Sequence, residues 1–167
     1  CIENERLGQA QAYIQKVCSE VETAKVIVFC ENETTNLIFS AFSRRAKNCG
    51  ITINIKAAIP QDIPLQENDW CVLLSNALEN ALHACQKLTE KDLPGSIDVS
   101  AYEKKGKMFL QVSNSCEEPV PFSHGVPAAS RPGHGIGVHS ICTIVEHYNG
   151  MYSFSVQNGL FILRLSL

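Results

Sequence analysis

Two asparagines one helical turn apart, Asn76 and Asn80, have the types and spacing best suited to chemistry in this chain. They lie in the segment DWCVLLSNALENALHACQKL, residues 69–88, whose apolar residues recur at helical spacing. A four-residue separation directs both carboxamides to one face of a helix. Asparagine is a poor helix former, and neither position can cap the helix. A carboxamide exchanges hydrogen bonds but cannot act as a general base. The pair therefore predicts a binding face, and the alternative is an ordinary polar outer face.

A second chemical signal is the alternation of Gly133, Gly135 and Gly137 directly before a predicted helix. Glycines there leave backbone amides and the positive end of the helix dipole open to an anion, most naturally a phosphate, and Arg131 adds a cation. The dinucleotide-binding fingerprint is excluded because position 138 is valine, and no Walker A sequence occurs. The alternative is a flexible hinge.

These residues need a scaffold, and the hydrophobic pattern predicts a mixture of helices and strands. Helices are expected at 4–24, 34–48, 69–88 and from the glycine segment to Asn149-Gly150, and strands at 26–30, 51–57, 96–102, 108–114, 151–157 and 160–167. The segment 115–132 has four prolines and no periodicity, which predicts a long loop. Hairpins are expected through Lys104-Lys105-Gly106 and Asn158-Gly159.

The inward faces of two helices follow from the same pattern. In the helix at 34–48 they are Leu37, Ile38, Ala41 and Phe42, and in the asparagine helix they are Leu74, Leu78, Ala81, Leu82 and Cys85. With hairpins toward the end of the chain, this predicts an α+β fold with helices packed on one face of a mixed, mostly antiparallel sheet.

Composition limits the function classes. The chain has 167 residues, 45% hydrophobic residues and a net charge of -3, which fits one ordinary domain and gives no reason to expect a nucleic acid partner. No apolar run reaches the ~20 residues of a membrane span. The eight cysteines form no C-x-x-C pair, so we interpret them as small hydrophobic residues of a reducing, cytoplasmic compartment.

Several motifs, taken in order, resemble a known family. The sequence NALENA at 76–81 resembles the N box, and GHGIGV at 133–138 resembles the G2 box, of the GHKL ATPases of gyrase, MutL and histidine kinases. More narrowly, FCENETTNLIFSAF, the IP turn before the asparagine helix, VSNSC and GHGIG look like AgrC-type sensor histidine kinases of Gram-positive bacteria. The resemblance covers nearly the whole chain and implies a Bergerat-type two-layer sandwich that binds ATP and Mg²⁺.

The resemblance also implies roles for individual residues. Asn80 matches the asparagine that coordinates Mg²⁺, and Asn76 matches its neighbour one turn earlier. Asn114 stands where the family's G1 box has the aspartate that accepts the adenine amino group, and Cys116 stands where that box has glycine. Residues 115–132 match the ATP lid. The remaining positions implied to contact the nucleotide are His83, Arg131, Gly133, His134, Gly135, Ile136 and Gly137.

The resemblance further implies a function in phosphotransfer. Gyrase and MutL have a glutamate at the position of Asn76 to activate water, so Asn76 favours transfer to an external histidine. Residues 1–24 resemble the end of a dimerisation helix, and 25–167 the ATP-binding catalytic domain. The implied partners are the phosphoacceptor helices of a homodimeric, membrane-anchored kinase and a response regulator. The alternatives are an anti-sigma-factor-type serine kinase and a degenerate, non-catalytic GHKL module.

Overall fold

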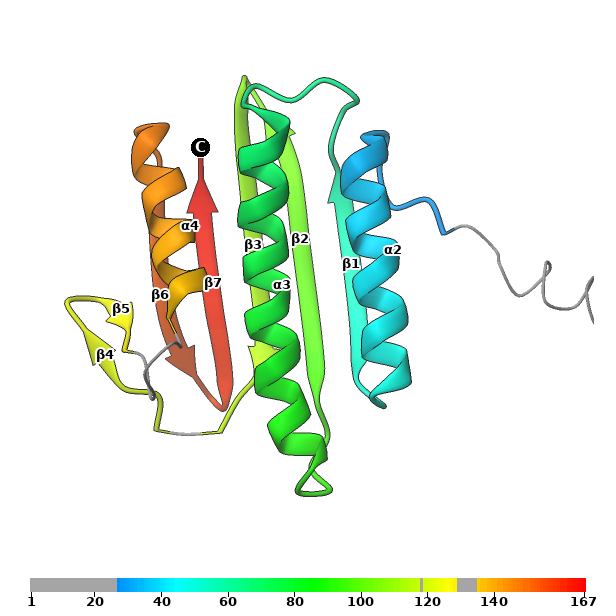
Figure 1. The fold of residues 1–167 in the computed structure, drawn as a ribbon, viewed down its shortest axis with the longest axis vertical. Helices are drawn as coiled ribbons and strands as arrows, with labels where there is room; N and C mark the ends of the chain where they lie inside the picture. The colour runs from blue at the N-terminus through cyan, green and yellow to red at the C-terminus, as the bar shows by residue number, and fades with distance from the viewer. Residues whose placement is uncertain (1–26, 118, 129–134) are drawn as a thin grey trace, which may run out of the picture.

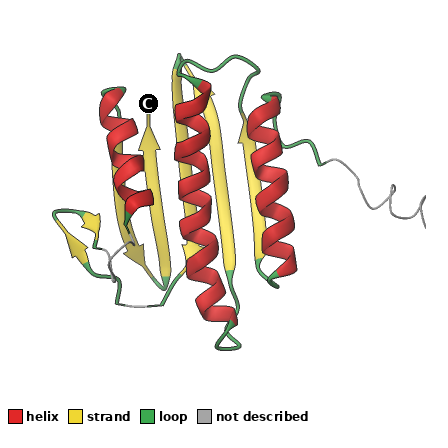
Figure 2. Ribbon diagram, in the orientation of Figure 1, coloured by secondary structure: helices red, strands yellow, loops and turns green. Residues whose placement is uncertain are grey.

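The computed structural model describes residues 27–117, 119–128 and 135–167. Within them, three helices lie on one face of a five-stranded sheet, as Figures 1 and 2 show. The helices are α2 (Glu33–Asn48), α3 (Glu67–Thr89) and α4 (Ile136–His147). The predicted α+β layer architecture is therefore confirmed. The predicted helix at 4–24 lies outside the described residues.

The sheet has the order β1-β2-β3-β7-β6, and only its edge pair β1–β2 is parallel. Its strands are β1 (Thr52–Ala58), β2 (Ser96–Lys104), β3 (Lys107–Ser115), β6 (Met151–Gln157) and β7 (Leu160–Ser166). Both predicted hairpins are present. Each is closed by two residues with positive φ, Lys105-Gly106 and Asn158-Gly159, which is the backbone that tight hairpin turns require.

Helix α2 begins at a side-chain cap, because Asn32 Oδ1 accepts a 2.8 Å hydrogen bond from the Thr35 amide. Its predicted inward face was partly wrong, since Leu37 is 69% exposed and Ala41 is also exposed. The side chains it buries are Thr35, Phe39, Phe42 and Ala46. α2 covers only the sheet edge at β1 and contacts α3 on one side. Its buried face is therefore narrow and is centred on Phe39 instead of Leu37 and Ala41.

Helix α3 crosses the middle of the sheet and buries every residue of its predicted apolar stripe. The side chain of Trp70 in α3 is fully buried, and its indole N–H donates a 2.9 Å hydrogen bond to Thr35 Oγ1 of α2. This bond connects the two helices. The start of α3 has no cap from its own N-cap residue. Instead, the Tyr148 hydroxyl just after α4 accepts from the Gln66 amide at 3.0 Å and donates to Asp69 at 2.8 Å.

Two predictions for the connecting segments need correction. Residues 27–30 form no strand, and the backbone partners in and just after this segment are not sheet neighbours. The Phe29 amide donates to Asn36 Oδ1 at 2.7 Å, and the next amides, of Glu31 and Asn32, donate to Ile59 O. The expected long loop at 115–132 contains a small hairpin, β4 (Phe122–Ser123) with β5 (Val126–Pro127). Its turn residues His124 and Gly125 both have positive φ.

No helix in the described residues has both the length and the apolar character of a membrane span.

Candidate functional site

The two asparagines and the glycine segment meet in the structure. Asn76 and Asn80 project from α3 toward Gly137 in the first turn of α4, and a Cβ at Gly137 would lie 3.2 Å from Asn76 Oδ1 and 3.5 Å from Asn80 Oδ1. Only a residue without a side chain allows this approach without displacing a carboxamide. The packing of α4 against α3 thus places two oxygen donors beside a helix N-terminus.

Within the described part of the chain, no side chain caps the N-terminus of α4. Its N-cap, Gly135, has a left-handed backbone with φ of 104° and supplies no side-chain hydrogen bond. The first amides of an α-helix have no acceptor within the helix, and they carry the positive end of the helix dipole. Ile136 at this end is 73% exposed, so its side chain does not cover the turn. Arg131, Gly133 and His134, predicted for the same site, lie outside the described residues.

A cavity of about 190 Å³ lies beside the asparagines, between α3, α4, the sheet and the segment after β3. Three alanines one turn apart on α3 line it, Ala77, Ala81 and Ala84, and their small side chains leave the space open. The other lining residues are Asn80, Val112, Asn114, Cys116, Val120, Pro127, Val138, Ile141, Phe154, Phe161 and Leu163. A mostly apolar cavity with few polar groups suits a small, partly apolar ligand.

The sequence placed Ala81 on the inward face of this helix, but it did not assign any of the three alanines to the site. Their spacing of four and three residues was visible in the sequence, but alanine in a helix also reads as simple helix propensity.

Asn114 is the buried polar group of the cavity, with 3% of its surface exposed. Its Nδ2 donates to the Ser115 carbonyl at 2.9 Å, so the atom of this carboxamide suited to accept a hydrogen bond is Oδ1. The Cys85 thiol is 3.3 Å from Ser96 O and 3.6 Å from Ser115 O. Burial raises the pKa of this thiol to about 11. Cys85 is therefore a protonated packing residue that supports the strand end carrying Asn114.

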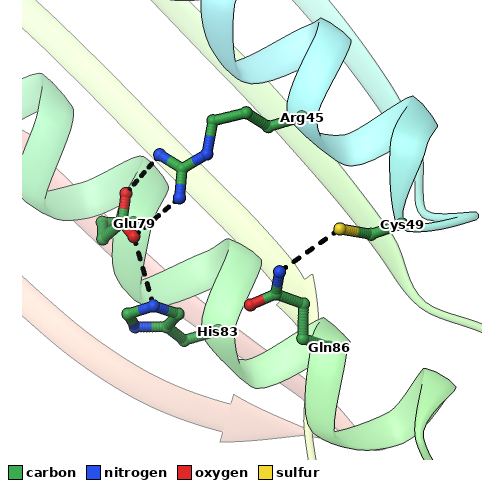
Figure 3. Close-up of polar contacts among 5 residues, drawn as sticks. All are labelled: Arg45, Cys49, Glu79, His83 and Gln86. Atoms are coloured by element: carbon green, nitrogen blue, oxygen red, sulfur yellow. Dashed lines mark hydrogen bonds and ion pairs between the residues drawn. The ribbon is translucent and has the colours of Figure 1, made fainter.

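His83 lies apart from the cavity lining. Its Nε2 is 3.2 Å from Glu79 Oε1, and its side chain is 58% exposed. Figure 3 shows Glu79 held from the other side by Arg45 of α2, whose guanidinium donates two hydrogen bonds of 2.6 and 2.8 Å. This contact lowers the pKa of Glu79 below its usual value. Farther along the same two helices, Gln86 donates to Cys49 Sγ at 3.3 Å.

The ion pair between Arg45 and Glu79 was not predicted from the sequence either. Its partners are far apart in the sequence, and no local pattern marks such a contact.

Fold and site together define a two-layer α+β domain with a mainly apolar cavity and an oxygen-rich, amide-rich rim between two helices. The family model described as the GHKL domain matches residues 65–167, more than half of the chain. The chain therefore belongs to the GHKL domain family.

Solved structures of histidine kinases share this fold. The nucleotide-free catalytic domain of histidine kinase ThkA is 15% identical with a TM-score of 0.61, covering 81% of this chain and 91% of that one. Mycobacterial sensor histidine kinase MprB is 16% identical with a TM-score of 0.60 and the same coverage of 81% and 91%. Acinetobacter baumannii histidine kinase AdeS is 11% identical with a TM-score of 0.55, covering 80% and 62%. No curated protein sequence matches significantly.

Proposed function

We propose that this chain is the ATP-binding catalytic domain of an AgrC-like sensor histidine kinase, which presents Mg-ATP to a histidine outside the chain. The main observation in support is the approach of Gly137 to Asn76 Oδ1 and Asn80 Oδ1 at the edge of the cavity. It combines hard oxygen donors, open helix amides and an apolar cavity, which are the needs of a metal, a phosphate chain and a base.

Each part of the site has a role in this proposal. The carboxamide oxygen of Asn80 would hold Mg²⁺, which neutralises phosphate charge when bound. Asn76 Oδ1 lies next to it and would orient the same region, while the first amides of α4 receive the phosphates. Asn114 Oδ1 would accept the adenine amino group inside the cavity, between the alanines of α3 and the sheet. His83 and the glycine segment from Arg131 onward complete the proposed contacts.

The same residues favour transfer over hydrolysis. Neither Asn76 nor Asn80 can take a proton from water, and the carboxylate that directly precedes Asn80, Glu79, is paired with Arg45 and His83. Catalysis by this chain would consist of positioning and charge neutralisation. We place the phosphoacceptor on dimerisation helices of the full-length kinase, of which residues 1–24 are the end, and 25–167 form the ATP-binding domain with its lid at 115–132. A response regulator would receive the phosphate from a membrane-anchored homodimer.

Calorimetry with a non-hydrolysable ATP analogue and Mg²⁺ tests the proposal. We expect the wild-type chain to bind and Asn80→Ala to bind at least about tenfold more weakly, a loss of about 1.4 kcal/mol. The matched control is Asn48→Ala, an exposed asparagine at the end of α2, which should bind as the wild type does. Equal binding by Asn80→Ala and the wild type would refute the assigned role, and no heat from either would favour a non-catalytic GHKL module.

A labelling experiment tests the direction of transfer. With γ-labelled ATP, the isolated chain should remain unlabelled, whereas a full-length kinase containing it should be labelled on histidine. Label on the isolated chain would contradict an external acceptor, and label on serine of a substrate peptide would favour the serine kinase alternative.

A further inference from the structure

The face of the sheet turned away from the helices carries an ordered pattern of side chains. Figure 2 shows the described helices on the opposite face. The strand registers place one row across the sheet as Lys56, Ser100, Gln111, Arg164 and Ser153. Contacts between neighbouring strands confirm the shared face, since Arg164 Nε donates to Gln111 Oε1 at 2.8 Å. This polar row continues across all five strands.

The outer face is basic although the chain is acidic. Its charged residues on the strands are Lys56, Lys104, Lys107 and Arg164, all exposed, against the single carboxylate of Asp98. The chain as a whole has a net charge of -3. The outer face of the sheet is therefore positively charged within an acidic chain, and it attracts anionic partners.

Two lysines on this face, Lys104 and Lys107, repel one another and so destabilise the unbound chain. Lys104 and Lys107 are direct cross-strand partners at the end of the β2–β3 hairpin. Like charges directly opposite one another destabilise an antiparallel pair. An anionic group bridging the two ammonium groups would remove this repulsion, so the pair itself is complementary to a carboxylate.

An apolar anchor lies one row further along the same strands. The rings of Tyr102 and Phe109 stack with centroids 5.0 Å apart and an interplanar angle of 14°. Tyr102 is 40% exposed, and Met151 across the sheet, next to Ser166, is 72% exposed. Aromatic, methionine and arginine side chains are enriched in protein interfaces.

We propose that this outer face, defined by Lys56, Tyr102, Lys104, Lys107, Phe109, Met151 and Arg164, docks an acidic protein segment that carries an apolar side chain. The acidic residues of the segment pair with the lysines, and its apolar side chain packs on the aromatic rings. An anionic membrane surface is the competing occupant, and binding to vesicles distinguishes it from a protein segment. The proposal is independent of nucleotide binding, since no residue of this face lines the cavity.

The probe is a short peptide in which glutamates flank a central leucine–phenylalanine pair, titrated into the isotope-labelled chain and followed by NMR. We expect amide shifts on β1, β2, β3, β6 and β7, and no shifts at Asn76 or Asn80. The double variant Lys104→Glu with Lys107→Glu should weaken binding about tenfold or more. It keeps a like-charged pair at the turn, so its stability should match that of the wild type.

Two matched comparisons make the test decisive. Arg44→Glu with Lys47→Glu changes the net charge equally on exposed positions of α2, in the helical layer, and should leave the affinity unchanged. A peptide with serines in place of the leucine–phenylalanine pair should bind more weakly. Equal losses in both double variants would show bulk charge attraction and overturn the proposal. Binding to phosphatidylserine vesicles that depends on Lys104 and Lys107, without peptide binding, would overturn it in favour of a membrane.

Discussion

Replacing Gly137 by alanine should separate the stability of this domain from its ability to bind a nucleotide. Glycine within a helix costs about 1 kcal/mol relative to alanine, so Gly137→Ala gains helix propensity in α4. The added Cβ would lie 3.2 Å from Asn76 Oδ1 and 3.5 Å from Asn80 Oδ1, and such contacts are relieved by shifts of a few tenths of an ångström. The folded chain can accommodate that shift, because Asn76 is half-buried and Asn80 is exposed.

A bound metal tolerates the same shift poorly, because Mg²⁺ demands near-ideal octahedral geometry. We therefore expect Gly137→Ala to raise the melting temperature by about 2–4 °C, or to leave it unchanged where the contact offsets the helix gain. The same variant should weaken binding of a Mg-ATP analogue about tenfold, or about 1.4 kcal/mol. Scanning calorimetry measures the first quantity and titration calorimetry the second.

The control is Thr143→Ala, an exposed position in the same helix that gains propensity without approaching either asparagine. It should raise stability slightly and leave the affinity unchanged. Wild-type affinity in a folded Gly137→Ala would refute the reasoning, because the close approach would then have no bearing on binding. A large loss of stability would show that the carboxamides cannot yield as assumed.

Three further substitutions test the contacts around the site, all by chemical unfolding. Asn114→Asp should lower the free energy of unfolding by about 1–3 kcal/mol, because a buried carboxylate cannot donate to the Ser115 carbonyl. Glu79→Gln should cost less than about 1 kcal/mol, because its partner Arg45 is exposed. Since Arg45 lowers the pKa of Glu79, that cost should be present above pH 4.5 and disappear as the pH falls through the lowered pKa. Tyr148→Phe should cost about 0.5–1.5 kcal/mol, because the amide at the start of α3 exchanges its acceptor for water. Unchanged unfolding curves would contradict the assignments of Asn114 and Tyr148, whereas a cost of several kcal/mol, or one that persists at low pH, would contradict that of Glu79.

The sequence predicted those parts of the fold that have local signals. The apolar stripe of α3 has helical spacing over its whole length, and Asn158-Gly159 can adopt the turn that a tight hairpin needs. The nearness of the asparagines to the glycine segment was also expected, from the motifs and their resemblance to a family. The structure brings Asn76, Asn80 and Gly137 together, and their roles with a nucleotide stay predictions.

Other parts depend on contacts that no local pattern contains. The parallel pairing of β1 with β2 joins strands separated by the whole of α3. The bidentate contact of Arg45 with Glu79 likewise joins two helices. Residues 27–30 illustrate the reverse case: they have strand-like composition, but Asn36 accepts the hydrogen bond of the Phe29 amide and no strand forms.

The position of the connection between β3 and α4, residues 116–135, has an evolutionary consequence. It leaves the sheet at Ser115 and the chain returns through α4 and β6, while β3 pairs directly with β7. Among the described residues of this connection, none adds a strand to the five-stranded sheet. The entropy of closing a flexible loop rises only by about 0.6 kcal/mol for each doubling of its length. Insertions and deletions between β3 and α4 should thus be nearly neutral for folding, so related proteins can diverge in this segment while keeping the same sheet and the same two helices around the cavity.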